Sequence, residues 1–248
     1  MFQIVRRTKA EGRRGTTTIR HSTPWQAVRY PVKVGALNMP GRLSQAGEGG
    51  RMKFHFIGGV AALDLVNTNY LWEGRRVETL SDGGAVRAWL GELRTEHPSL
   101  ELPSEATIAR IPARKLLAAT RTTRAALDTI VDLLVAGSPV PEAALAQLNR
   151  VLAGYTVQFR MHAEKRDMEL YEVVGGDELS RVLGPIIATL EATEFNRNGR
   201  LRRCTNRVDC SAAFYDTSKS ATRRFCVPEI CGNRVRLARH YAKRRSEA

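Results

Sequence analysis

The sequence predicts a mainly α-helical fold: a helical body with one β-hairpin, followed by a small C-terminal module that contains four cysteines and ends in a basic helix. Three observations lead to this prediction. Apolar residues recur at helical spacing through most of the 248-residue chain, one stretch at 155–174 alternates between apolar and polar residues, and every cysteine lies in the last 45 residues. A chain of this length can bury one large hydrophobic core or two modest ones.

The first part of the helical body contains short apolar segments with capping residues. Residues 54–57 are apolar enough for a short strand or a buried lead-in, and 61–71 have the spacing of a short helix. Asp82 is a candidate N-cap for the next helix, and Ser104 begins a further helical region. Pro112 should break or restart this region, because proline disrupts a helix interior.

Proline and glycine delimit the longer helices. Apolar residues recur from Ala113 to a candidate C-cap at Gly137. Pro141 is suited to the first turn of the following helix, which we expect to end at Gly154.

The alternation at 155–174 predicts the hairpin, with its turn near 164–167. Asp177 then caps a helix that continues to Leu190, and Pro185 is expected to kink it. These elements complete the predicted helical body.

The basic residues are concentrated at the two ends of the chain. The net charge of +14 divides into +7 for residues 1–50, −3 for residues 51–196 and +10 for residues 197–248. A distribution of this kind is typical of a protein that meets a polyanion, such as nucleic acid, an acidic membrane surface or an acidic partner.

Composition divides the chain into three parts. Residues 1–51 form a basic extension without an apolar period, which we expect to be disordered or untranslated, with Met52 as the alternative start. Residues 52–199 form the helical domain and 200–248 the C-terminal module. No stretch approaches the roughly 18 apolar residues of a membrane span, and no secretory signal is evident. We therefore expect a cytoplasmic protein with no membrane partner.

The four cysteines are spaced as two pairs. Cys204 and Cys210 enclose five residues, Cys226 and Cys231 enclose four, and fifteen residues separate the pairs. Clustering of this kind in a cytosolic protein points to a metal rather than to disulfides, and four thiolates suit a closed, structural Zn²⁺ site. Two free thiol pairs, a redox switch and a [2Fe–2S] cluster are the alternatives.

A basic amphipathic helix follows the last cysteine. Such a helix can enter a major groove or lie along phosphates. The predicted nucleic-acid contacts, on this helix and around the cysteine pairs, are Arg202, Arg203, Arg223, Arg224, Arg234, Arg236, Arg239, His240, Lys243 and Arg244.

Two segments resemble known bacterial domains. Residues 202–245, with the motif Cys231-Gly232-Asn233-Arg234, resemble the CGNR-type zinc finger, and residues 56–68 (FIGGVAALDLVNT) resemble the start of the ABATE domain that precedes this finger. The resemblance implies a mainly helical, stress-linked transcription regulator whose four cysteines bind zinc. The sequence departs from the pattern in two places: the first cysteine pair encloses five residues instead of four, so that Arg207 or Val208 would bulge, and Phe225 stands where tryptophan is usual.

The residues around the motif also have expected roles. Gly232 lets the chain turn off the metal, and Asn233 caps or braces the knuckle. Arg234 either reaches Asp216 or contacts phosphate.

The sequence favours a DNA-binding regulator without enzymatic activity. An RNA-binding or ribosome-associated module is one alternative. The other is a small-molecule-binding or enzymatic helical domain with a polar pocket at Asp64 and Asn67, for which capping and core hydrogen bonding are the competing interpretation. A homodimer through the helical domain and a small-molecule effector are further expected partners.

Overall fold

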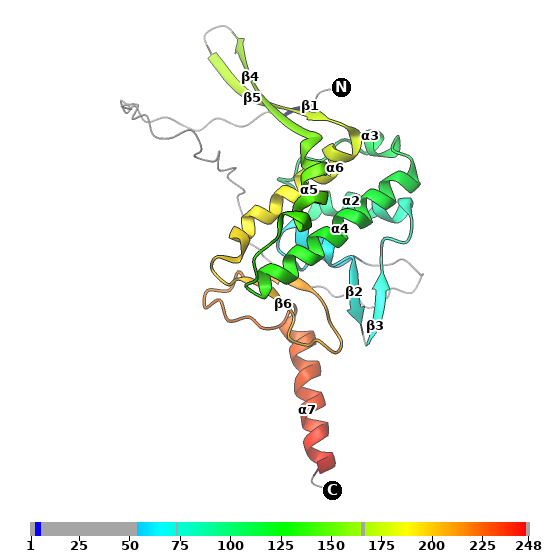
Figure 1. Ribbon diagram of the computed structural model, residues 1–248, viewed down its shortest axis with the longest axis vertical. Coiled ribbons are helices and arrows are strands. Elements are labelled where there is room, and N and C mark those ends of the chain that lie inside the picture. The colour runs from blue at the N-terminus through cyan, green and yellow to red at the C-terminus, as the bar shows by residue number, and fades with distance from the viewer. Residues whose placement is uncertain (1–2, 6–53, 73, 165–166, 247–248) are drawn as a thin grey trace, which may run out of the picture.

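The fold is a helical body with a long hairpin at one end and a projecting helix at the other (Figure 1). The computed structural model describes residues 3–5, 54–72, 74–164 and 167–246. The predicted fold class is confirmed: the chain is mainly helical, and the cysteine module follows the helical body and ends in a helix. Of the predicted extension 1–51, only β1 (Gln3–Val5) lies within the described residues, and it pairs antiparallel with β5 (Asp167–Gly176).

The first helix of the body is shorter than the sequence predicts. Helix α1 (Ala61–Val66) ends at the C-cap Asn67, and the chain then forms β2 (Asn69–Trp72) and β3 (Arg75–Glu78). These strands pair antiparallel around Gly74, which has a φ of 74°. Apolar spacing missed this second hairpin because its four-residue strands are half-buried and show no alternation.

The β2–β3 hairpin is attached to the body through Glu78. Arg124 is only 8% exposed, and its guanidinium donates to both oxygens of this carboxylate at 2.7 and 2.5 Å. Burial raises the pKa of Glu78, but the interactions with Arg124, Asn69 and Leu80 N together outweigh burial, and the net pKa is lowered.

The next helices begin at the predicted caps. The Asp82 carboxylate accepts a hydrogen bond from Ala85 N at 2.9 Å at the start of α2 (Gly83–Glu96), and Ser104 caps α3 (Glu105–Ala109). These short polar side chains satisfy amide groups that have no partner inside the helix.

The longest helix of the described residues, α4 (Ala113–Val135), starts directly after Pro112. It ends just before Gly137, the glycine that the sequence predicts at its C-terminus. Gly137 has a φ of 68°, and Ser138 N donates to Leu133 O at 2.9 Å. This is a Schellman arrangement, in which a residue beyond the helix satisfies one of its last carbonyls.

The second half of the body contains the predicted hairpin between two helices. Helix α5 (Glu142–Ala153) leads into β4 (Tyr155–Glu164), which pairs along its whole length with β5 (Asp167–Gly176). Helix α6 (Glu178–Ala188) follows and continues as the 3₁₀ helix η1 (Thr189–Asn196). Beyond the body, β4 and β5 expose large apolar side chains at Phe159, Met161, Met168 and Leu170. The expected homodimer through the helical domain stays a prediction.

The core surrounds α1, all six residues of which are buried. Helices α4 and α6 and the η1 segment pack against it. The largest side chains of this core include Trp89, Leu63, Leu65, Leu116 and Leu127.

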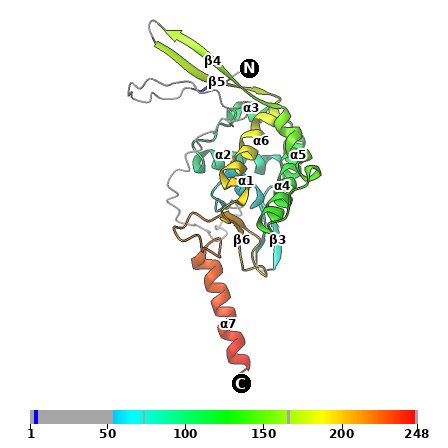
Figure 2. The same ribbon diagram turned by 60° about the vertical axis from the view of Figure 1, so that its left-hand side comes forward.

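The C-terminal module shares this core. It comprises β6 (Leu201–Arg203), β7 (Ala213–Tyr215), the π-helical turn η2 (Pro228–Gly232) and α7 (Asn233–Ser246). Leu201 and Ala213 belong to the hydrophobic cluster of the body. Helix α7, in contrast, has no buried residue and projects away from the rest of the chain (Figures 1 and 2).

No helix among the described residues is long and apolar enough to cross a membrane.

Candidate metal centre and basic surface

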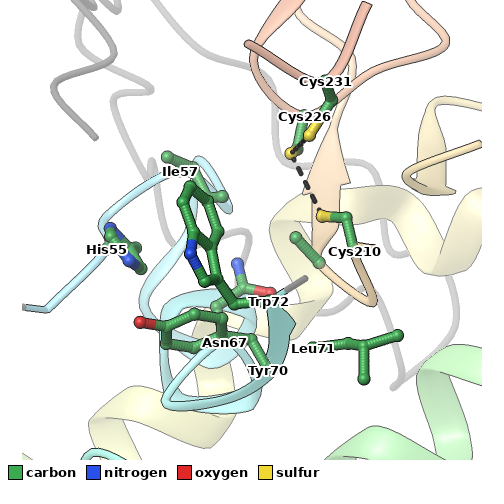
Figure 3. Close-up of a pocket in the computed structure, with 10 residues that line it drawn as sticks. His55, Ile57, Asn67, Tyr70, Leu71, Trp72, Cys210, Cys226 and Cys231 are labelled. Atoms are coloured by element: carbon green, nitrogen blue, oxygen red, sulfur yellow. Dashed lines mark hydrogen bonds between the residues drawn. The ribbon is translucent and has the colours of Figure 1, made fainter. Parts of the chain in front are cut away.

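The structure brings the four cysteines to one point. Their Sγ atoms all lie within 4.8 Å of one another, and all four residues are buried. Sγ of Cys226 is 3.6 Å from the Sγ atoms of both Cys210 and Cys231 (Figure 3). A tetrahedral zinc site with Zn–S bonds of about 2.3 Å places its sulfurs roughly 3.8 Å apart, whereas a disulfide needs about 2.05 Å. The four cysteines are positioned to bind a metal ion, and their number, chemistry and spacing fit structural Zn²⁺.

Backbone hydrogen bonds form the two turns that carry the thiols. Cys210 N donates to Asn206 O at 2.8 Å, and Cys231 N donates to Val227 O at 2.9 Å. The longer first turn places its Val208 side chain in solvent, where it is 77% exposed. The additional residue therefore extends outward and leaves the cluster closed.

The closeness of the four thiols favours a bound cation. Hydrogen bonds with the other three thiols lower the pKa of Cys204, whereas hydrogen bonds with Cys204, Cys210 and Cys231, together with burial, raise the pKa of Cys226. Four thiolates this close repel one another, so all four ionise together only around a positive ion. Zn²⁺ supplies that charge and, with four protein ligands, has no open position for substrate.

A buried carboxylate braces the loop before the second cysteine pair. Asp216 accepts hydrogen bonds from Ser218 N at 2.9 Å, from Ser218 Oγ at 2.6 Å and from Arg223 N at 2.8 Å. Burial raises its pKa, but these bonds outweigh that effect and lower it. Arg223 in turn donates to Phe225 O at 3.0 Å and lies over the Phe214 ring. Arg223 thus supports the cysteine loop from within.

The arginine of the Cys231-Gly232-Asn233-Arg234 motif contacts the helical body. The guanidinium of Arg234 lies 4.0 Å from the ring centroid of Trp72, at the end of β2. This cation–π contact takes the place of the predicted reach to Asp216. It connects the start of α7 to the β2–β3 hairpin.

Two arginines before the first cysteine also have structural partners. Arg202 donates to Ala221 O at 2.7 Å. Arg203 is 8% exposed and donates to Asp128 Oδ1 at 2.5 Å and to Asp132 Oδ1 at 2.9 Å, both on α4. The structure therefore corrects the predicted phosphate contact of Arg203. Its side chain is buried, and its guanidinium nitrogens already donate to Asp128 and Asp132.

Replacing Arg203 with methionine tests this structural role. We expect a loss of about 2–3 kcal/mol in the free energy of unfolding, since hydrogen bonds to charged groups contribute about 1.5–3 kcal/mol. Urea unfolding of the zinc-loaded chain measures it. Arg207→Met, at an exposed position in the same module, is the control and should change stability by less than about 0.5 kcal/mol. Equal stability of the two variants would contradict the assignment.

The remaining predicted contacts are open to solvent. Arg224 lies beside the second cysteine pair, and α7 carries the rest of the exposed set: Arg236, Arg239, His240, Lys243 and Arg244. Asn233 donates through its amide to Glu229 O and accepts from the Arg236 guanidinium. The motif asparagine therefore orients an arginine as well as bracing the knuckle.

Asp64 and Asn67 face different partners and do not share a pocket. Asp64 accepts from Gly58 N at 2.7 Å and contacts His97 Nε2 at 2.7 Å, and burial raises its pKa despite the opposing effect of His97. Asn67 makes two hydrogen bonds of 2.9 Å to Ala213, one to its carbonyl and one from its amide. Capping and core hydrogen bonding thus describe both residues.

A cavity of about 20 Å³ lies between Asn67, the β2 strand and the cysteines (Figure 3). It has room for about one water molecule and for no larger ligand.

The contacts between the module and the body were not foreseen from the sequence. Besides the Asn67 pair, Leu71 N donates to Ser211 Oγ at 2.9 Å and Tyr215 N donates to Gly58 O at 2.8 Å. The one available signal was the polar Asn67 in an apolar segment, for which the sequence allows either core hydrogen bonding or a polar pocket but does not indicate the partner Ala213.

Two family models match the chain, one over the helical body and one over the cysteine module. Residues 59–192 match the ABATE model, whose description is "Putative stress-induced transcription regulator", and residues 200–244 match the CGNR zinc finger. No curated protein matches the chain.

Proposed function

This chain belongs to the ABATE family and carries a CGNR zinc finger, and from that premise we propose that it is a cytoplasmic, non-enzymatic regulator that binds DNA through α7. The family and the finger support a zinc-binding regulator. DNA as the partner rests on the charge and exposure of the C-terminal helix.

The carrying observation is the composition of α7. Residues 233–246 contain six Lys or Arg residues and no Asp or Glu. Every residue from Arg236 to Ser246 is exposed. A solvated surface helix normally mixes both charge signs, so an all-basic helix favours a polyanionic partner.

The metal and the body support this use of the helix. Zinc holds the two cysteine turns together and contributes folding free energy to a segment with few large apolar residues. The Arg234–Trp72 contact then fixes the base of α7 to the body, and the Arg203 ion pairs fix β6, beside the first cysteine, to α4. The helix of 14 residues is about 21 Å long, which suits insertion into a major groove.

Salt dependence tests the proposal. Fluorescence anisotropy with a random-sequence duplex should give a log–log salt slope of roughly −5 if about six phosphates are contacted. The triple variant Arg236→Ala, Arg239→Ala and Lys243→Ala should weaken binding and reduce the slope to roughly −2 to −3, with zinc content unchanged.

The matched control removes the same charge from the helical body. Arg110, Arg114 and Lys115 are exposed around the start of α4, and their replacement with alanine should leave the slope within about one unit of wild type. An equal loss in both triple variants would mean that α7 is not the contact surface. Selection from a random duplex pool then shows whether binding is sequence-specific.

RNA is the second candidate, and one exposed aromatic residue favours it. Tyr241 is 58% exposed on α7, where its ring could stack on an unpaired base. Preference for a single-stranded RNA over a duplex DNA of equal length, lost in Tyr241→Ala, would favour this alternative.

A further inference from the structure

A groove of about 270 Å³ lies between the second cysteine pair and the first turns of α7. Its walls carry three arginines, Arg224 from the cysteine loop and Arg236 and Arg239 from the helix. The lining contains no acidic residue. Three basic residues without an acidic one make the concave surface electropositive, so the groove is complementary to an anion.

Two of these arginines are available for a ligand. Arg224 and Arg239 are exposed, and no side-chain hydrogen bond or ion pair engages them within the described part of the chain. Thr205 N donates to Arg224 O at 3.0 Å, which fixes the Arg224 backbone beside the first cysteine. Thr205 also lines the groove, and threonine carries a hydroxyl donor.

The third arginine is already oriented. Asn233 accepts a hydrogen bond from Arg236 and donates one to Glu229 O. This arrangement restricts the Arg236 side chain before any ligand binds, which lowers the entropy lost on binding.

The rest of the lining is apolar. Phe225, Pro228 and Val235 contribute to it, and the Phe225 ring packs so closely on Gly232 that an added Cβ there would lie 3.3 Å from it. Arginines beside an apolar surface suit a phosphodiester with its attached sugar better than a bare inorganic ion.

We propose that this groove seats one backbone phosphodiester of the bound DNA, held jointly by Arg224, Arg236 and Arg239. The inference rests on the proposed function, and it adds the place at which the DNA backbone is anchored. A phosphate fixed at the base of α7 sets the register of the helix on the duplex, as phosphate contacts do in other DNA-binding proteins.

A double-mutant cycle on the full zinc-loaded chain tests whether Arg224 and Arg239 hold the same phosphate. Arg224→Ala and Arg239→Ala should each raise the duplex Kd about tenfold. The double variant should raise Kd on the order of thirtyfold or less, at least about threefold below the hundredfold product, because both arginines hold the same phosphate. Zinc content and the circular dichroism spectrum report whether each variant is folded.

The control cycle pairs Arg224→Ala with Arg207→Ala, which is exposed in the first cysteine loop and does not line the groove. Arg207→Ala should raise Kd by about twofold or less, and its effect should multiply with that of Arg224→Ala. Multiplying effects in the Arg224–Arg239 cycle, or an Arg224→Ala loss no larger than the control's, would overturn the seat while DNA binding stands. No binding by the wild-type chain at low salt would overturn both proposals.

Discussion

Replacing Cys226 with serine is expected to abolish stoichiometric zinc binding and to unfold the C-terminal module. Cys226 Sγ lies 3.6 Å from two other ligand sulfurs, so its loss opens the coordination shell. Structural zinc contributes about 10–16 kcal/mol in small four-ligand modules, which is as large as the whole stability of a typical domain. We therefore expect the loss to extend beyond the module, since Leu201 and Ala213 are part of the core of the body.

Metal analysis and amide hydrogen exchange measure this outcome. Zinc should fall from one ion per chain to none, and protection should be lost in β6 and β7 as well as at the cysteine turns. Val208→Ser, in the same loop as Cys204 and Cys210 but 77% exposed, is the matched control and should retain its zinc. A Cys226→Ser variant that keeps one tightly bound zinc would show that the ligand set is different.

Local signals in the sequence were sufficient for most of the fold. Asp82, Ser104 and Gly137 mark real helix ends because a cap is a short-range interaction that needs only neighbouring residues. The long hairpin was predictable for the same reason, as the alternation runs along β4 and through the first residues of β5. The β2–β3 strands are too short to show a period, and Asn67 ends α1 where apolar residues alone predict that it continues.

The metal centre was predictable and its surroundings were not. Four cysteines at the end of a chain indicate a metal by their chemistry alone. The sequence around Cys204 gives no indication that the adjacent Arg203 pairs with Asp128 and Asp132, more than seventy residues earlier. A basic residue beside a metal ligand has the same appearance in sequence whether it faces phosphate or a buried ion pair, so only the packing of β6 on α4 decides between the two roles.

The contacts between module and body give the regulator a fixed geometry. The finger joins the body through the Tyr215 N–Gly58 O hydrogen bond, the Arg203–Asp128 ion pair and the Arg234–Trp72 contact, in addition to the shared core. The module and the helical body are therefore connected through packed elements within the described part of the chain.

The buried side-chain amide of Asn67 connects the helical body directly to the zinc module. We expect Asn67→Asp to be among the most destabilising substitutions at positions other than the four cysteines. Asn67 is 3% exposed and pairs with both the amide and the carbonyl of Ala213 at 2.9 Å. An ionised carboxylate at this position faces the Ala213 carbonyl without a donor between them. An uncompensated buried charge of this kind costs about 3–5 kcal/mol.

The pH dependence separates this effect from a simple loss of packing. Burial raises the pKa of the introduced carboxyl above its unfolded value of about 3.9, so the folded variant binds a proton that the unfolded chain has released. The destabilisation is therefore full above the raised pKa and shrinks as the pH falls through it, because the protonated carboxyl again donates to Ala213 O. Urea unfolding of zinc-loaded protein from pH 8 down to pH 6 should show this recovery. Asn149→Asp, exposed on α5, should stay within about 0.5 kcal/mol of wild type. If Asn67→Asp matched that control, or lost further stability as the pH fell, Asn67 would not connect the zinc module to the body.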